Sequence, residues 1–342
     1  MAGIGLPAIP HYTLSAIALL IAATPCHARE TPPPPPSAAQ LRAIGDYGAA
    51  EGDAEIAQQN GALMLQRAGR PPVSLAPAGH DRWRSIEGQP PVTIRITRSA
   101  AIIDGATLPR HDFGAEVQAG IRKGARVDGP RLRAAALAVT PPAEPPARRP
   151  DDLVALADVV PHVRLDIRYA GTNNFLGTAV YDRPGAWLQR PAAEALARAA
   201  RALAEEGYGL VIYDAYRPWF ATRMFWDAVP AASHVFVADP AEGSRHNRGC
   251  AVDLGLVDLK TGKPIEMPSR YDEFSRRAFP DYAAGTDRQR WFRDRLRRAM
   301  EAEGFTVYPQ EWWHFDCQGW QDYAIGTRTF GELERRAVPP RH

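Results

Sequence analysis

The sequence predicts an α+β fold for the second half of its 342 residues, because helical segments and short strands are mixed there without a regular strand–helix–strand alternation. Residues 191–206 are dominated by Ala, Leu, Arg and Glu, with leucines at helical spacing. The run 210–212 is short, apolar and partly β-branched, which is typical of a strand. A second helix is expected at about 288–303, with Gly304 as its stop.

The N-terminal residues predict export. An apolar run from Thr13 to Thr24 is followed by Cys26-His27-Ala28, whose alternate small residues suit cleavage after Ala28. No Lys or Arg precedes the run, which at about a dozen residues is short for a membrane span. We expect residues 1–28 to be a signal peptide and the periplasm to be the destination, with no stable membrane span after cleavage. An uncleaved anchor and a cytoplasmic protein are the alternatives.

Two proline-rich stretches divide the rest of the chain. Residues 29–40 contain a proline run that favours an extended tether, and residues 140–150 combine prolines with charge, as expected of a linker. Between them, residues 41–139 are expected to form a small, β-rich N-terminal module. Alternating apolar residues at 92–96 indicate a strand, and Asp104-Gly105 indicates a turn. The sequence assigns this module no function.

Composition limits the classes of partner. Hydrophobic residues make up 45% of the chain, enough to bury at least one substantial core. The 41 basic residues are balanced by 39 acidic ones, so the basic excess that a phosphate-binding surface requires is missing. Nucleic acid is therefore not an expected partner.

The run from Ser244 to Asp253 contains the first candidate metal ligands. His246 and Asp253 lie seven residues apart, with Gly249 and other small residues between them that permit a tight chain path. Taken alone, this pattern more often marks an ordinary hydrogen-bonded pair than two ligands of one metal ion.

A second constellation, Glu311 to Phe315, embeds a glutamate and a histidine among three large aromatic residues. Ionisable groups in such surroundings are costly unless they are paired or bound to metal. The alternative is an aromatic-rich core strand whose histidine has ordinary hydrogen-bond partners and binds no metal.

Combined, the two motifs predict a zinc site. His246, Asp253 and His314 are ligands of types that zinc accepts, and they leave a fourth position open. Glu311 could then take a proton from the attacking water and pass it to a leaving amine. Arg217, directly after a predicted strand, could stabilise the charge that develops on the carbonyl oxygen, or could simply be an exposed partner of a nearby aspartate. The predicted chemistry is metal-assisted amide hydrolysis, although another divalent ion is not excluded.

These residues resemble the D-alanyl-D-alanine dipeptidase family of zinc peptidases over roughly 157–322. Residues 244–253 match the motif S-x-H-x-x-G-x-A-x-D, residues 311–314 match E-x-W-H, and residues 214–218 match D-x-Y-R-P. The segment 166–177 is similar to the opening segment of the dipeptidase branch, which separates it from the related D,D-carboxypeptidases.

The resemblance implies a fold and an activity for residues 151–342. The expected fold is a mainly antiparallel sheet flanked by helices, with one zinc ion per chain in a cleft. The zinc ligands would be His246, Asp253 and His314, with Glu311 as general base and acid and Arg217 as stabiliser of the transition state. The expected reaction is hydrolysis of D-Ala-D-Ala to two D-alanines in cell-wall peptide metabolism.

The resemblance also suggests how substrate is held. Ser244 would contact the terminal carboxylate, Tyr169 would line the pocket, and Asp272 would pair with the free amino group, so that the pocket accepts dipeptides only. Asp272 could instead be a helix cap. Because His246 and His314 should bind one ion, the nearby thiols of Cys250 and Cys317 are expected to approach each other. They would form a disulfide if the protein is exported, or remain two buried thiols.

Two rival functions stay open at this point. One is a D,D-carboxypeptidase that acts on longer peptidoglycan peptides, whose pocket would be open at the amino end. The other is a wall-binding protein in which the N-terminal module acts and the peptidase domain is a remnant.

Overall fold

The computed structural model describes residues 30–337. The predicted signal peptide lies outside the described residues. The proline run leads into helix α1 (Ala38–Ala43), which begins inside the segment expected to be an extended tether. A capping box explains this difference, because Ser37 accepts a hydrogen bond from the backbone of Gln40 while the Gln40 side chain accepts one from the backbone of Ser37.

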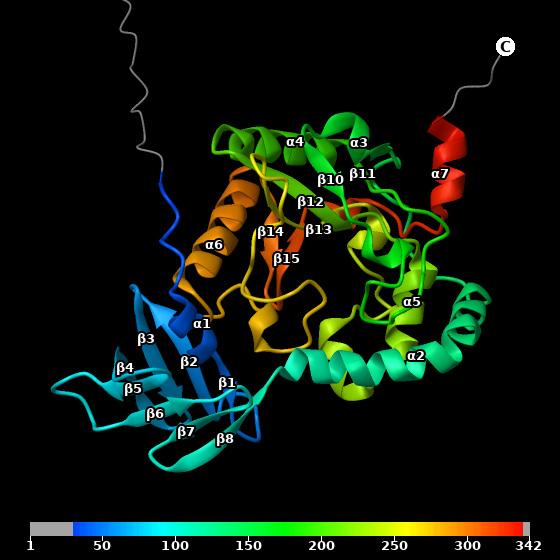
Figure 1. The fold of residues 1–342 in the computed structure, drawn as a ribbon. Helices are drawn as coiled ribbons and strands as arrows, with labels where there is room; N and C mark the ends of the chain where they lie inside the picture. Colours follow the sequence, from blue (N-terminus) through cyan, green and yellow to red (C-terminus); the bar gives the residue numbers. More distant parts are fainter. Residues whose placement is uncertain (1–29, 338–342) are drawn as a thin grey trace, which may run out of the picture. The chain divides into compact units, whose positions relative to one another are not determined.

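The N-terminal module contains a closed antiparallel barrel of eight strands (Figure 1), which confirms its predicted β-rich character. The barrel closes because the first strand pairs with both the second and the last. At the predicted turn, Asp104 and Gly105 both have positive φ angles of 51° and 88°, as a tight hairpin requires. The strands are β1 (Gly45–Tyr47), β2 (Ala54–Gln59), β3 (Ala62–Arg67), β4 (Arg70–Pro77), β5 (Arg82–Ser85), β6 (Thr93–Ile96), β7 (Ala100–Ile103) and β8 (Ala106–His111).

A long helix that the sequence analysis did not predict follows the barrel. Helix α2 (Phe113–Leu137) is capped at its N-terminus by Asp112, whose side chain accepts a hydrogen bond from the backbone of Ala115, and it contains Pro130. Its glycines and its proline are poor helix formers, which explains why the helix is hard to recognise from sequence. Residues 140–150 then form neither helix nor strand.

A five-stranded sheet in the order β10-β12-β13-β15-β14 forms the centre of the C-terminal half. All neighbouring strands are antiparallel except β10 and β12, so the predicted mainly antiparallel sheet is confirmed. A small second sheet pairs β9 with β11. The strands are β9 (Leu153–Ala155), β10 (Val163–Leu165), β11 (Trp187–Gln189), β12 (Tyr208–Asp214), β13 (Ala251–Asp258), β14 (Thr306–Tyr308) and β15 (Glu311–Asp316).

Helices α4 and α6 pack against each other and against the strands of this sheet (Figure 1). They are the two helices that the sequence predicts, and Gly207 and Gly304 follow them with positive φ angles of 91° and 85°. The helices of this half are α3 (Leu156–Val159), α4 (Arg190–Glu205), α5 (Trp219–Ala228), α6 (Asp287–Ala302) and α7 (Phe330–Ala337), with short 3-10 turns η1 (Arg168–Ala170), η2 (Ala231–Phe236), η3 (His246–Arg248), η4 (Arg276–Ala278) and η5 (Trp320–Asp322).

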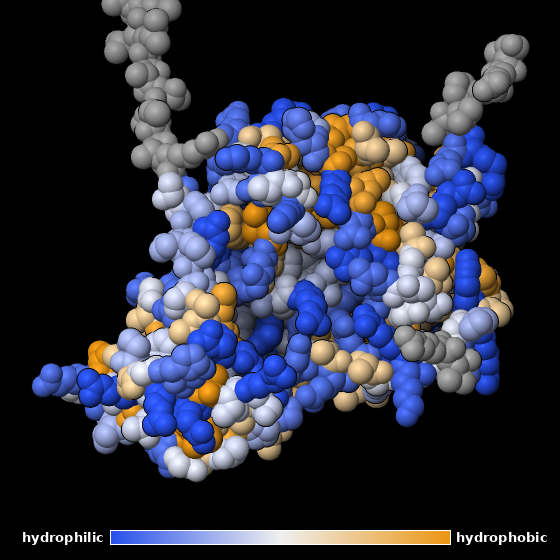
Figure 2. Space-filling view, in the orientation of Figure 1, coloured by the Kyte–Doolittle hydropathy of each residue, from blue (hydrophilic) through white to orange (hydrophobic). Residues whose placement is uncertain are grey.

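The surface seen in Figure 2 is mostly hydrophilic, with apolar residues in separate patches. Among residues 30–337, no helix combines the length and the apolar character that crossing a membrane requires.

Candidate active site

Two adjacent strands bring together the residues that the two motifs single out. Asp253 on β13 lies directly opposite His314 on β15 in the antiparallel register. His246 belongs to the turn η3, which ends at Gly249 with a left-handed φ of 65° before β13 begins. The reversal at Gly249 therefore brings an imidazole from outside the sheet next to a carboxylate on the sheet.

The three side chains form a buried cluster. Asp253 Oδ1 lies 3.3 Å from His246 Nε2 and 3.1 Å from His314 Nδ1, and the two imidazole nitrogens are 3.0 Å apart. Asp253 Oδ1 has no hydrogen-bond partner among the described residues. A buried carboxylate oxygen that makes ion-pair contacts but no hydrogen bond is costly, and a metal ion bound to all three side chains would remove that cost.

The other nitrogen of each imidazole has its own acceptor, which orients the ring. His246 Nδ1 lies 2.6 Å from the carbonyl oxygen of Ala215, and His314 Nε2 lies 2.9 Å from Asp316 Oδ1. Acceptors at these positions favour the tautomers that direct a lone pair toward the cluster, as in the outer shell of metal sites. Burial lowers the pKa of His314, but Asp316 and Asp253 outweigh it and raise that pKa to about 10. The cluster therefore favours a positive charge at this point, and a metal cation could replace the proton.

Glu311 lies next to this cluster, at the start of β15. Its Oε2 is 3.5 Å from His314 Nδ1, and its side chain is 17% exposed. Burial and the nearby Asp253 carboxylate raise the pKa of Glu311 to about 8, although His314 opposes them. A carboxylate of this basicity suits proton transfer near neutral pH.

Arg217 is buried beside the cluster. Its Nη2 lies 2.8 Å from Asp214 Oδ2 and 3.9 Å from Asp253 Oδ2, and Asp214 is itself fully buried. The ion pair with an aspartate that the sequence suggested is therefore present, but Arg217 is buried and not exposed. Its guanidinium lines the same cavity as the His-Asp-His cluster.

A single cavity of about 490 Å³ is lined by all the residues that the sequence analysis assigned to catalysis, metal and substrate: Tyr169, Arg217, Ser244, His246, Asp253, Asp272, Glu311 and His314. Asp272 Oδ1 accepts a hydrogen bond of 2.8 Å from the Tyr169 hydroxyl, whereas its buried Oδ2 has no partner among the described residues. Burial raises the pKa of Asp272 to about 7 despite that hydrogen bond. Asp272 therefore lines the cavity and is not the N-terminal cap of any described helix.

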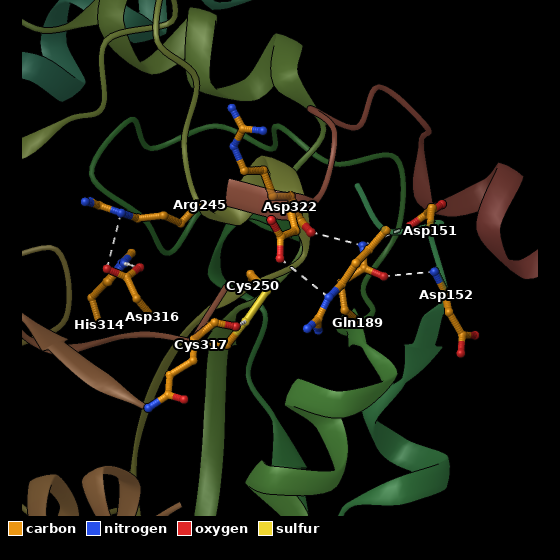
Figure 3. Close-up of a disulfide and its surroundings, with 12 residues drawn as sticks. Asp151, Asp152, Gln189, Arg245, Cys250, His314, Asp316, Cys317 and Asp322 are labelled. Carbon is orange, nitrogen blue, oxygen red and sulfur yellow. Dashed lines mark hydrogen bonds and ion pairs between the residues drawn. A yellow bond between two sulfur atoms is a disulfide. The ribbon is translucent and has the colours of Figure 1, made fainter. Parts of the chain in front are cut away.

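A disulfide lies next to the His-Asp-His cluster. Cys250 and Cys317 are joined with a Cα–Cα distance of 5.1 Å, and they flank the paired strands β13 and β15 (Figure 3). Cys317 also donates a backbone hydrogen bond of 2.7 Å to the carbonyl oxygen of Cys250. Figure 3 shows Arg245 paired with Asp316, the carboxylate that contacts His314.

Two residues of the site, Asp316 and Tyr271, were not singled out from sequence, and Asp214 was expected only as an exposed partner of Arg217. Asp316 contacts His314, Asp214 pairs with Arg217, and Tyr271 donates a hydrogen bond of 2.9 Å to Asp253 Oδ2. A signal existed for Asp316, because residues two apart on a strand share a face. Tyr271 had no signal beyond its place next to Asp272.

The fold and the site define the chain as a metallopeptidase: a buried His-Asp-His cluster lies beside a glutamate and an arginine in one cavity. A family model described as D-ala-D-ala dipeptidase matches residues 149–330. The chain belongs to this family of zinc metallopeptidases.

Curated relatives match the same half of the chain. The D-alanyl-D-alanine dipeptidase of Escherichia coli (strain K12) is 35% identical over 177 residues, which is 51% of this chain and 89% of the relative. That of Enterococcus faecium is 34% identical over 178 residues, 47% of this chain and 88% of the relative. The solved LdcB LD-carboxypeptidase is 20% identical, with a TM-score of 0.29 over 56% of this chain and 75% of that one.

Proposed function

We propose that this protein hydrolyses D-alanyl-D-alanine to two D-alanines, with one zinc ion held by His246, Asp253 and His314. The observation that carries the proposal is the shared cavity, where this cluster lies beside Glu311 and Asp272. The relatives named D-alanyl-D-alanine dipeptidases match about half of the chain, and the family model spans every one of these residues.

Zinc in this cluster would supply Lewis acidity toward the scissile carbonyl. Glu311 takes a proton from the attacking water and delivers it to the leaving amine as the C–N bond breaks. The guanidinium of Arg217 stabilises the negative charge that develops on the carbonyl oxygen. Asp214 holds Arg217 in place through its 2.8 Å ion pair, and burial strengthens this electrostatic contribution.

The two ends of the dipeptide have candidate partners in the cavity. The unpartnered Oδ2 of Asp272 accepts the substrate ammonium, and Tyr169 holds the other oxygen of that carboxylate. Ser244, which is 6% exposed and also lines the cavity, contacts the terminal carboxylate. An ammonium paired with a buried carboxylate favours a free amino terminus, because an acylated one would leave the carboxylate unpaired.

The proposal includes export to the periplasm, action on cell-wall peptides and wall contact through the N-terminal module. The apolar run Thr13 to Thr24 supports export, and a disulfide is compatible with an oxidising compartment. Fractionation of cells that produce the full-length chain tests this part, because recovery of the protein in the cytoplasmic fraction would contradict it.

A comparison of two substrates tests the activity. Purified zinc-loaded protein is given free D-Ala-D-Ala or a pentapeptide that ends in D-Ala-D-Ala, and released D-alanine is measured. The proposal expects release from the dipeptide and little from the pentapeptide. The reverse preference would establish a D,D-carboxypeptidase and remove the role of Asp272 at the amino end. Release from neither substrate, together with binding of the N-terminal segment to wall material, would favour the wall-binding rival.

A further inference from the structure

The N-terminal module contacts the segment that carries Asp272. Gln118, in the second turn of α2, is 9% exposed and donates a hydrogen bond from Nε2 to the backbone carbonyl oxygen of Asp272. One turn earlier, Gly114 packs so closely that an added Cβ would lie 1.6 Å from Glu273 Oε1. Helix α2 therefore lies directly against residues 272 and 273.

The backbone of Asp272 needs such support. Its φ of 59° lies in the left-handed region, which residues other than glycine adopt at a cost of about 1 kcal/mol or more. A strained residue keeps its conformation only where the surroundings hold it. In this conformation the carbonyl oxygen meets Gln118 while the carboxylate meets Tyr169 and lines the cavity. The hydrogen bond from Gln118 therefore stabilises the backbone geometry that aims the carboxylate.

The following residues contact the barrel in the same way. Arg277 Nη2 lies 2.8 Å from Asp46 Oδ2, and the backbone nitrogen of Arg276 donates a 2.7 Å hydrogen bond to Glu51 Oε1. Residues 272–277 therefore contact both α2 and the barrel, and these contacts hold the segment at several points. Neither α2 nor the barrel is covered by the family model, which begins at residue 149.

We propose that Gln118 is a positioning residue for recognition of the substrate's amino group. It acts through Asp272 and touches neither the substrate nor the metal ligands. The inference rests on the proposed dipeptidase function and adds to it a role for the N-terminal module, which supplies part of the selectivity for a free amino terminus.

The test replaces Gln118 by Met in the full-length protein, because Met keeps the length of the side chain and removes the donor. Lys123→Met is the matched control, since Lys123 is an exposed residue on the same helix. Zinc content, KM and kcat are measured for D-Ala-D-Ala, and kcat/KM is measured for N-acetyl-D-Ala-D-Ala.

We expect Gln118→Met to raise KM for the free dipeptide by about threefold to tenfold, the effect of one hydrogen bond, with kcat and zinc content nearly unchanged. Preference for the free over the acetylated dipeptide should fall by a similar factor. Should Gln118→Met fail to fold, Gln118→Glu takes its place, because an ionised carboxylate also lacks the donor. Unchanged kinetics, or an equal loss on both substrates, would overturn the inference. Absence of D-alanine release by the wild-type protein would instead contradict the proposed function.

Discussion

Asp253 and His314 face each other across neighbouring antiparallel strands, with Asp253 Oδ1 3.1 Å from His314 Nδ1. The register of β13 and β15 thus places two of the three candidate ligands next to each other. Replacement of Asp253 by Ala should leave the fold intact and reduce zinc from one per chain to a small fraction, because two imidazoles remain. Metal analysis after dialysis checks this. Full zinc occupancy in Asp253→Ala would show that the ion binds elsewhere.

Asp316 should act on zinc affinity without being a ligand. Its Oδ1 lies 2.9 Å from His314 Nε2, so Asp316→Asn removes the negative charge that orients and polarises the imidazole. We expect zinc affinity to fall by about tenfold to a hundredfold. Competition with a chelator of known affinity measures this. Unchanged zinc affinity would mean that Asp316 only forms the ion pair with Arg245 and does not influence the metal site.

The ionisation of Asp272 should appear in the pH profile. Burial raises the pKa of Asp272 to about 7, and only the ionised carboxylate attracts an ammonium. Therefore kcat/KM for D-Ala-D-Ala should rise with pH as Asp272 loses its proton. Positive charge from bound zinc can only lower this pKa, so the rise should lie at or below about pH 7. In Asp272→Asn the part of this rise that belongs to Asp272 should disappear, leaving the ionisation of Glu311, and KM should increase. A limb that persists unchanged in this variant belongs to another group.

The disulfide should contribute mainly to stability. It closes a loop of 67 residues between Cys250 and Cys317, and a cross-link of this span restricts the unfolded chain. The Cys250→Ala, Cys317→Ala double variant should lose about 2–4 kcal/mol of unfolding free energy yet still bind zinc. Denaturant titration provides the first value and metal analysis the second. Mass spectrometry of unreduced wild-type protein should find no free thiol at either position, and two free thiols would contradict the bond.

Local patterns in the sequence predicted much of the C-terminal half. Helices α4 and α6 have strong helix formers and glycine stops, and β12 is a short β-branched run. The candidate ligands lie in two short motifs whose spacing already limits their geometry. The structure brings these motifs together through the pairing of β13 with β15, a long-range contact that no local pattern specifies.

Other features depended on contacts between distant residues. Closure of the barrel requires β1 to pair with β8, and α2 contains glycines and a proline that local propensity disfavours. The hydrogen bond from Gln118 to Asp272 joins residues 154 positions apart. Tyr271 likewise reaches Asp253 only in the folded chain. Such roles follow from tertiary structure and have no signature in a single sequence.

The most direct test of the account is D-alanine release from D-Ala-D-Ala by the zinc-loaded wild-type protein and by Glu311→Gln, each with and without chelator. Glutamine keeps the shape of Glu311 but cannot accept the proton of the attacking water, so the rate should fall by on the order of a hundredfold or more while zinc content stays the same. Chelation should abolish wild-type activity, and added zinc should restore it. D-alanine release that persists in the wild-type protein after chelation, and that is equally fast in Glu311→Gln, would contradict a zinc peptidase that uses Glu311 as its base.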